Sequence, residues 1–408
     1  MSEQQQPERE VEQAGVAPSM SSPSLSEMEA RQAREQAIHQ AGQPRAGEVM
    51  AGAHGRVEEE TRRLSERMTR EEQERRRALA LAKTAPLTTA AEPKRQLPEP
   101  LPIRSTLVAL DGTPFAERAL PYAAALAHLT GSAITLGACA HPYGREPEPA
   151  QAVEDVETDD VALSSSERAL RASLREARSR LTAEGVTAQA RVVYSSDVSD
   201  GLLALGRQVS ADALALATHA RGGIERAVLG SVADEVVRQG RGLTLVVPPL
   251  APDASVDGAV FERALVPLDG STLSEQTLRV LQPMIQHDPA GEDERRWLLS
   301  VTLFFVADDQ AQVRDGEVYL HDLREALLHA ATAPTEITAQ VLLGSAPGAI
   351  VARAAGAHPT LPTHDERHDL IIMATHGRGG AGRWFYGSVA TYVLAHSDVP
   401  VLLMRTAQ

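Results

Sequence analysis

The chain has 408 residues, of which 43% are hydrophobic and only 3% aromatic, and its formal net charge is −15. This length allows two ordinary domains with additional sequence, whose cores must be built mainly from aliphatic side chains. The acidic balance argues against a nucleic-acid-binding protein, because a phosphate backbone requires a concentrated basic face. The single cysteine, Cys139, excludes an internal disulfide framework and is better explained as a small buried side chain than as a catalytic thiol.

The start of the chain predicts neither secretion nor membrane insertion. Residues 1–4 are polar and lead into no apolar run of the kind that a secretory signal contains. A membrane-spanning helix would need an uninterrupted apolar stretch of about 18 residues, and none occurs. We therefore expect a cytoplasmic protein with no membrane partner.

The first 100 residues differ in composition from the rest. No Phe, Tyr or Trp precedes Phe115, so this stretch cannot bury enough apolar surface to offset its ordering entropy. Residues 56–82 contain Glu and Arg repeatedly spaced four apart, which is typical of a charged helix. We predict a disordered, charged arm over 1–100, with a candidate helix at 56–82 and a proline-rich linker at 86–102. Its protein partner is unknown.

After the linker the chain repeats itself. The matching pairs are Asp111-Gly-Thr with Asp269-Gly-Ser, Ala-Thr-His219 with Ala-Thr-His376, and Gly230-Ser with Gly387-Ser. The offset is 158 residues for the first pair (269 − 111) and 157 for the other two (376 − 219 and 387 − 230). Three ordered matches at one offset indicate a duplication. We place one domain at 101–250, a linker at 251–260 and a second domain at 261–408.

Each copy alternates short apolar strands with helices. In the first copy we expect strands at 106–110, 133–138, 188–194, 213–217 and 243–247, and helices at 114–130, 165–183, 201–208 and from 230. In the second we expect strands at 264–268, 298–306, 337–343, 370–374 and 399–404, and helices from 272, at 318–330, at 349–355 and from 388. This order predicts two tandem, doubly wound α/β domains with five-stranded parallel sheets. Such sheets bind ligands beyond strands one and four, where the winding reverses.

A glycine-rich loop follows the fourth strand of the second copy. Glycines let the backbone approach an anion closely, so that several N–H groups can converge on it. Gly387 and Ser388 then begin a helix, whose first N–H groups are unpaired within the helix and whose dipole favours negative charge. Arg378 or Arg383 could add positive charge. A duplicated loop between a buried strand and a helix favours a phosphate site.

These motifs resemble the universal stress protein family, over residues 103–248 and 261–405. Nucleotide-binding members of that family carry Gly-x-x-Gly, nine residues, and then Gly-Ser or Gly-Thr. The second copy matches three of the four positions, with Ala374 in place of the first glycine. In the first copy both leading glycines are alanines, Ala217 and Ala220, which predicts a degenerate site.

The resemblance implies ATP or a related adenine nucleotide as ligand, with no metal beyond the Mg²⁺ that accompanies it. It also implies an aspartate near the adenine and ribose, matched by Asp269 and Asp111. The alternative is that both aspartates only turn the chain and cap a helix. The expected contacts are Pro267, Asp269, Ala374, His376, Gly377, Arg378, Gly387, Ser388 and Val389, with Asp111, Gly230 and Ser231 as weaker ones.

The function implied is that of a stress-response regulator that binds nucleotide without strong catalysis, since no nucleophile or second base accompanies His376. The alternatives are an interaction scaffold that binds no nucleotide and a slow nucleotide hydrolase. Family members pair through their last strands, so 243–247 and 399–404 should join the two copies as an internal pseudo-dimer. Assembly into a homo-oligomer is left open.

Other motifs are set aside. No lysine follows Lys94, which excludes a Walker-type phosphate loop in the folded part. Two histidines four apart in 364–369 suggest a metal site if helical, but the flanking prolines and the next strand make this segment a loop. The acidic stretch 154–160 is expected to be a solvated loop.

Overall fold

The computed structural model describes residues 95–141, 153–157, 163–218, 230–240, 242–256, 258–286, 296–357, 367–375 and 387–405. The chain divides into two units, Met1–Thr89 and Ala90–Gln408. The predicted arm up to residue 94, with its candidate helix, lies outside the described residues. The fold below is that of the second unit.

The strands of this unit form one continuous sheet. In the first repeat they are β1 (Ser105–Leu110), β2 (Ala133–Ala140), β3 (Val153–Asp155), β4 (Ala188–Tyr194), β5 (Ala213–Ala217) and β6 (Gly242–Val247). In the second they are β7 (Arg263–Leu268), β8 (Ser300–Ala307), β9 (Glu336–Leu343), β10 (Leu370–Ala374) and β11 (Val401–Arg405). Among the described residues the order is β3-β4-β2-β1-β5-β6-β11-β10-β7-β8-β9.

Within each repeat five strands run parallel, as predicted. In the first repeat the order is β4-β2-β1-β5-β6, and in the second it is β9-β8-β7-β10-β11, so the two halves have the same topology. The winding direction reverses between the first strand and the fourth, which are β1 and β5 in one repeat and β7 and β10 in the other. The doubly wound α/β fold class is therefore confirmed.

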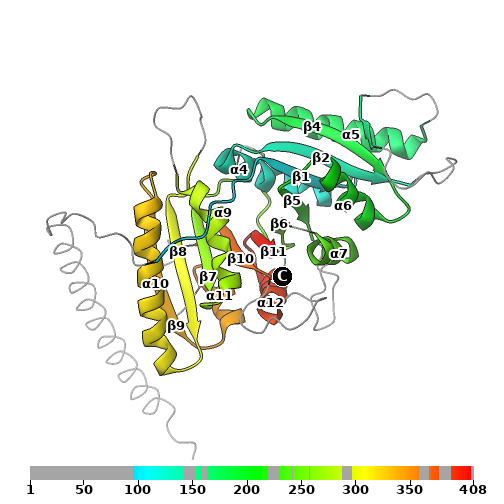
Figure 1. The fold of residues 1–408 in the computed structure, drawn as a ribbon. Helices are drawn as coiled ribbons and strands as arrows, with labels where there is room; N and C mark the ends of the chain where they lie inside the picture. Colours follow the sequence, from blue (N-terminus) through cyan, green and yellow to red (C-terminus); the bar gives the residue numbers. More distant parts are fainter. Residues whose placement is uncertain are drawn as a thin grey trace, which may run out of the picture. The chain divides into compact units, whose positions relative to one another are not determined.

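The two repeats join through their last strands. Strands β6 and β11 pair in antiparallel register, with Leu245 opposite Leu402, and both side chains are fully buried. Figure 1 shows the two strands side by side between the two sets of helices. This pairing is the one that the family resemblance implied, and it makes a single sheet where two separate ones would each leave an edge exposed.

The helices cover both faces of the sheet. They are α3 (Pro114–Glu117), α4 (Ala119–Thr130), α5 (Ser165–Ala183), α6 (Val198–Gln208), α7 (Ser231–Gln239), α8 (Thr272–Glu275), α9 (Thr277–Met284), α10 (Gln310–Ala330), α11 (Ala346–Ala354) and α12 (Ser388–His396). Consecutive residues of β8 illustrate the two layers, because Phe304 and Phe305 are both buried but lie in different hydrophobic clusters. Such strands need apolar residues at successive positions, which is why they form continuous apolar runs in the sequence.

Several helix predictions were wrong in detail, and those after the first strands and near 318 differ most. The single helix expected after each first strand is divided by a tight turn, because the N–H of Arg118 bonds to the carbonyl of Phe115, three residues back, at 3.2 Å. The corresponding turn at Gln276 divides α8 from α9. Helix α10 begins at Gln310, not near 318, because the Asp309 side chain accepts the N–H of Gln312 at 2.9 Å and caps it.

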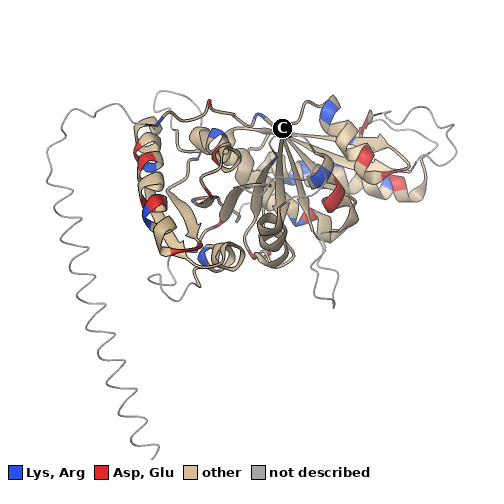
Figure 2. Ribbon diagram, turned by 60° about the horizontal axis from the view of Figure 1, so that its bottom comes forward, with Lys and Arg blue, Asp and Glu red and all other residues tan. Residues whose placement is uncertain are grey.

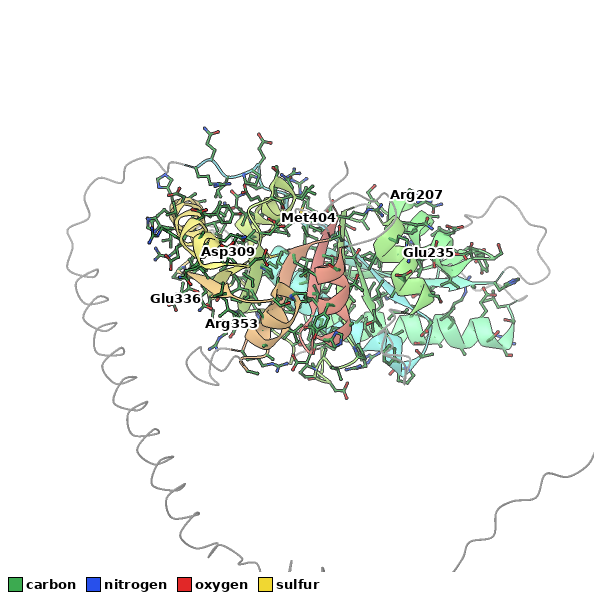
Figure 3. All side chains as sticks on the ribbon, turned by 90° about the horizontal axis from the view of Figure 1, so that it is seen from below. Arg207, Glu235, Asp309, Glu336, Arg353 and Met404 are labelled. Atoms are coloured by element: carbon green, nitrogen blue, oxygen red, sulfur yellow. The ribbon has the colours of Figure 1, made fainter. Side chains whose placement is uncertain are left out.

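Figure 3 shows Asp309 and Glu336 of the second repeat on one side of Met404 in β11, and Arg207 and Glu235 of the first repeat on the other. In the view of Figure 2, acidic and basic residues are interspersed over the described helices. None of the described helices combines the length and apolar character needed to cross a bilayer.

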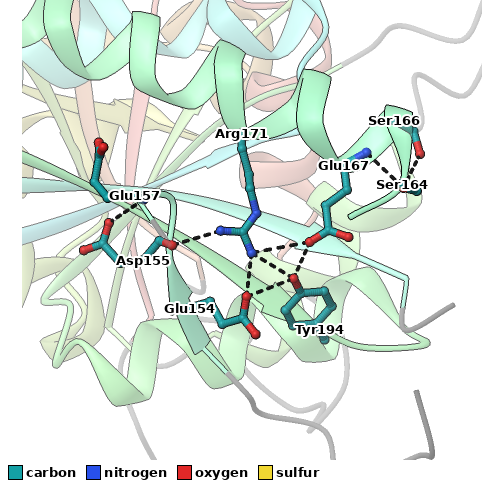
Figure 4. Close-up of polar contacts among 8 residues, drawn as sticks. All are labelled: Glu154, Asp155, Glu157, Ser164, Ser166, Glu167, Arg171 and Tyr194. Carbon is teal, nitrogen blue, oxygen red and sulfur yellow. Dashed lines mark hydrogen bonds and ion pairs between the residues drawn. The ribbon is translucent and has the colours of Figure 1, made fainter. Parts of the chain in front are cut away.

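The prediction of a solvated loop at 154–160 was wrong for its first residues. Glu154 and Asp155 belong to β3, which pairs antiparallel with β4 at the edge of the sheet. Arg171, on α5, is only 1% exposed and donates hydrogen bonds to the Asp155 carbonyl at 2.9 Å and the Glu154 carboxylate at 2.6 Å (Figure 4). A buried guanidinium requires such partners, and they hold the acidic segment against the sheet.

Two further side chains complete the network around Arg171. The phenol of Tyr194 accepts a hydrogen bond from Arg171 at 2.9 Å and lies against the carboxylates of Glu154 and Glu167 (Figure 4). Burial and the neighbouring Glu167 carboxylate raise the pKa of Tyr194 to about 12. The tyrosine therefore stays neutral and can donate to a carboxylate.

Candidate functional site

The turn after the first strand has the same geometry in both repeats. The Asp269 carboxylate accepts hydrogen bonds from the backbone N–H of Ser271 at 3.0 Å and from its hydroxyl at 2.6 Å. The Ser271 hydroxyl oxygen in turn accepts the N–H of Ser274 at 3.1 Å and caps α8. Gly270, between them, has a φ of 79°, a left-handed conformation that favours glycine.

In the first repeat Asp111 accepts the same pair of bonds from Thr113, at 2.9 and 2.6 Å. The turn-forming role that the sequence offered as the alternative is thus present in both copies. The surroundings differ, because Asp111 is exposed whereas Asp269 is half-buried. A partly desolvated carboxylate interacts more strongly with a bound polar group than an exposed one.

The ends of β7 and β10 lie at one edge of the sheet. These strands are parallel neighbours, so Asp269, just after β7, and Thr375, just after β10, leave the sheet on the same side. Pro267 and Ala374, two of the expected contacts, are buried at the ends of these strands, and Ala374 is 8% exposed. The topology therefore brings together two predicted segments that lie more than 100 residues apart in the sequence.

Helix α12 begins at this same edge. The N–H of Gly387 donates to the carbonyl of Thr375 at 2.7 Å, which ties the start of the helix to the end of β10. Among the described residues no side chain caps the first turn of α12, where Ser388 is exposed and Val389 is half-buried. The N–H groups of such a turn, with the positive end of the helix dipole, suit an anionic ligand.

Helix α7 of the first repeat differs in its first turn. It begins at Gly230 and Ser231 like its counterpart, and no described side chain caps it either. However, Asp234 lies in its first turn and forms an ion pair with Arg238, whereas Thr391 occupies the equivalent position in α12. A carboxylate at this point satisfies the helix dipole and repels a second anion.

Three expected contacts, His376, Gly377 and Arg378, lie outside the described residues, as does the corresponding loop of the first repeat. The structure therefore describes the two ends of each glycine-rich loop but not the loop. Within the described ranges no cluster of three or more His, Cys, Asp or Glu side chains could hold a metal ion.

Cys139 and His368 lie outside this edge of the sheet. Both have reactive side chains, but their buried environments favour a structural role. Cys139 is half-buried, and burial raises the pKa of its thiol, which disfavours a reactive thiolate. His368, from the segment weighed as a metal site, is 3% exposed with Nε2 3.0 Å from the hydroxyl of Thr302. Burial and the cation of Arg353 lower the pKa of His368 to about 3, so the ring is neutral.

Three residues beside Asp269 were not predicted. Glu275 ends α8, Tyr319 lies on α10, and Arg95 precedes the first strand of the other repeat. Arg95 forms an ion pair with Glu275, and its guanidinium carbon lies 4.9 Å from the centroid of the Tyr319 ring. Arg95 and Glu275 are 180 residues apart, and no local pattern in the sequence points to such a contact.

Comparison with known families agrees with this architecture. The model of the universal stress protein family matches residues 102–248 and again 261–405. The chain belongs to the universal stress protein family. The two matches correspond to the two repeats of the sheet, so this is a tandem member of the family. No match is found among curated proteins.

Solved structures with this fold come from several organisms. A universal stress protein from Archaeoglobus fulgidus is 14% identical, covers 74% of this chain and 97% of its own, and has a TM-score of 0.52. A member from Burkholderia pseudomallei is 23% identical over 36% of this chain and 96% of its own, with a TM-score of 0.26. A universal stress protein in complex with cAMP is 24% identical over 36% of this chain and 98% of its own, with a TM-score of 0.27. The first of these supports the two-repeat fold.

Proposed function

We propose that this universal stress protein binds ATP or a related adenine nucleotide, mainly in its second repeat, and regulates a stress response without strong catalysis. The nucleotide phosphates lie at the start of α12, over Gly387, Ser388 and Val389. The loop residues Gly377 and Arg378 complete the phosphate site, with His376 beside them. Pro267, Asp269 and Ala374 face the adenosine part.

The observation that carries this proposal is the start of α12. Its first turn has no acidic residue and no cap from a described side chain, and it is bonded to the end of β10, beside the β7 turn that holds Asp269. An anion placed there gains both the N–H groups and the helix dipole. The first repeat, with Asp234 in the matching turn and two alanines in its loop, is proposed as a weak site.

The test is isothermal titration of ATP into the wild-type protein and a Gly377→Asp variant. The new carboxylate occupies space near the phosphates and repels them, so we expect at least a tenfold loss of affinity, on the order of 1.4 kcal/mol. The matched control is Ala220→Asp, the equivalent change in the first repeat, which should leave the affinity unchanged. Equal heats from wild type and Gly377→Asp would refute the assignment to the second repeat.

Thermal melting provides an independent measurement. A ligand at 100 times its dissociation constant stabilises the folded state by about 2.7 kcal/mol, so the melting temperature should rise with ATP. AMP and cyclic dinucleotides serve as further probes. We add cAMP because one matched family member was solved in complex with it. A protein that responds to none of them is an interaction scaffold. Release of phosphate that is lost in both Ser388→Ala and His376→Ala would instead show a slow hydrolase.

A further inference from the structure

The segments that precede the two first strands each dock on the other repeat. Residues 249–253, from the connection that leads to β7, lie against the first repeat, where Arg118 donates to the Asp253 carboxylate at 2.9 Å and to the Pro249 carbonyl at 3.1 Å. The hydroxyl of Tyr122 donates to the carbonyl of Pro252 at 2.6 Å. Residues 95–101, which lead to β1, lie against the second repeat instead. We name residues 95–101 the strap.

The strap follows the helix pair α8–α9. The side-chain amide of Gln282 donates to the carbonyl of Pro98 at 2.7 Å, and Arg279 donates to the carbonyl of Glu99 at 3.0 Å. The N–H of Leu101 returns a bond to the Arg279 carbonyl at 2.7 Å. In Figure 1 the segment that leads to β1 passes the second repeat before it reaches β1. Backbone groups of the strap are thus paired by one helix along its length.

Arg95, at the start of the strap, supplies the second repeat with a positive charge from a segment that lies outside that repeat. It pairs with Glu275 and stacks on Tyr319, as described above. The equivalent carboxylate in the first repeat is Glu117, which is bound within its own repeat by Arg180 of α5 at 2.6 Å. The two repeats therefore neutralise the same carboxylate differently, and only in the second does the contact depend on the strap, as far as the described residues show.

This contact is adjacent to the proposed nucleotide site. Glu275 ends the four-residue helix α8, whose capping residue Ser271 is bound by Asp269. The Tyr319 hydroxyl is buried, and its ring lies under the Arg95 guanidinium. Burial raises its pKa, the carboxylates of Glu275 and Asp269 raise it further, and Arg95 lowers it. Arg95 and Asp269 therefore shift the pKa of the same phenol in opposite directions.

We propose that docking of the strap and binding of nucleotide in the second repeat favour each other, with Arg95 as a positioning residue for that site. The proposal rests on the proposed function and adds its regulation. Removing Arg95 leaves the Glu275 carboxylate without this cation on the helix that Asp269 adjoins, and the added negative charge weakens binding of an anionic nucleotide. Coupling between two binding events is reciprocal, so bound nucleotide stabilises the docked strap by the same factor.

The sequence offers a direct probe of strap docking. The whole chain contains two lysines, Lys83 and Lys94, so a lysine-specific endoprotease has only two bonds to cleave. The bond after Lys94 is followed at once by Arg95, and a protease must bind residues on both sides of the bond in extended form. Cleavage after Lys94 therefore requires an undocked strap, while cleavage after Lys83 in the same molecule serves as the reference.

The experiment uses the full chain, with and without saturating ATP, and three variants. Gln282→Leu removes the bond to Pro98 without changing any charge or the cleaved sequence. Arg279→Ala removes the bond to Glu99 at a half-buried position, which is a second way to loosen the strap if Gln282→Leu does not fold. Arg180→Ala is the matched control, because it breaks the Glu117 ion pair of the first repeat and leaves the strap intact.

We expect ATP to slow cleavage after Lys94, relative to Lys83, by about fivefold, and the two strap variants to bind ATP about fivefold more weakly. Arg180→Ala should match the wild type in both measurements. If ATP binds but does not change the Lys94 cleavage rate, and the strap variants bind ATP as tightly as the wild type, this proposal alone is overturned. Absence of ATP binding by the wild type overturns the proposed function and this coupling together.

Discussion

In the first repeat the Glu117 carboxylate is held by Arg180 and Ser173 of the same repeat, at 2.6 and 3.1 Å, whereas the equivalent Glu275 of the second repeat is held by Arg95 from the strap. For this pair of equivalent carboxylates, the first repeat supplies the cation itself, whereas the second takes it from the strap. A duplication allows this division, because one copy can keep the fold stable while the other depends on the rest of the chain.

The sheet edges differ in the same sense. In the first repeat β3 pairs with the outer strand β4 and is held by Arg171. Strand β3 comes from the 24 residues between β2 and α5. In the second repeat only two residues separate β8 from α10, so no such strand can form. The outer strand β9 carries Leu343, which is 51% exposed. An insertion in one copy has therefore become part of its sheet.

What the repeats share is set by backbone geometry. Both have an Asp-Gly turn after the first strand with glycine φ values of 78° and 79°. Both also place an aspartate before the fourth strand, where Asp212 accepts the N–H of Ser105 at 3.1 Å and Asp369 accepts that of Arg263 at 3.0 Å. These contacts pair backbone N–H groups at the start of each first strand, and a buried backbone group that loses its hydrogen bond is costly in either copy.

Among the changes that test this comparison of the two repeats, replacement of Arg171 is expected to have the largest effect on stability. Replacing this buried arginine with leucine leaves Glu154 and Glu167 without their cation, so the free energy of unfolding should fall by about 3–5 kcal/mol. Urea denaturation measures this loss, and hydrogen exchange should show β3 detached from β4. The control is Arg178→Ala, in the partly exposed ion pair with Glu157, for which a loss below about 1 kcal/mol is expected. Equal losses would show that the network around Arg171 does not fasten the edge.

The second effect concerns His368, which aligns with Ala211 of the first repeat. Its pKa is about 3 when folded and about 6.5 when unfolded, so below pH 6.5 the unfolded chain binds a proton that the folded chain does not. Protonation of this residue in the unfolded chain therefore has no effect on the free energy of unfolding above pH 6.5 and lowers it progressively as the pH falls. Relative to His368→Ala, the wild type should lose about 2 kcal/mol between pH 7.5 and pH 5.

Denaturation of both proteins at the two pH values measures this difference. Asp369 acts in the opposite direction, because burial raises its pKa to about 6 and its protonated form stabilises the fold as the pH falls from 6 toward 3.8. It is present in both proteins and cancels in the comparison. Parallel pH profiles for wild type and His368→Ala would contradict the prediction.

The smallest effect sharpens the comparison of the two helix starts. Thr391→Asp gives α12 the acid that Asp234 provides in α7, and we expect affinity for ATP to fall about fivefold, because the carboxylate competes for the helix dipole. The melting temperature without ligand should stay the same or rise slightly. Thr391→Asn, of the same size and uncharged, is the control. Similar affinities for the two variants would show that charge at this turn does not distinguish the repeats.

Much of the fold follows from the sequence alone. The strands β4, β5 and β10 and the helix α5 have the predicted bounds, because continuous apolar runs and well-placed caps such as Ser164 are local signals. The duplication also follows from the sequence, and with it the pairing of equivalent turns. The family resemblance predicted which strands would join the two repeats.

The tertiary structure decided what depends on contacts between distant segments. Residues 154–155 are acidic and resemble a solvated loop, but they form a strand that pairs with β4, and a buried arginine on α5 binds their oxygens. The strap is a proline-rich linker by composition, and its position along α9 rests on hydrogen bonds between its backbone and α9 that no local sequence pattern predicts. Local sequence determines which elements form, since caps and apolar periods act within a few residues. The pairing of charges across 180 residues is determined only when the chain has folded, because it requires two surfaces to meet.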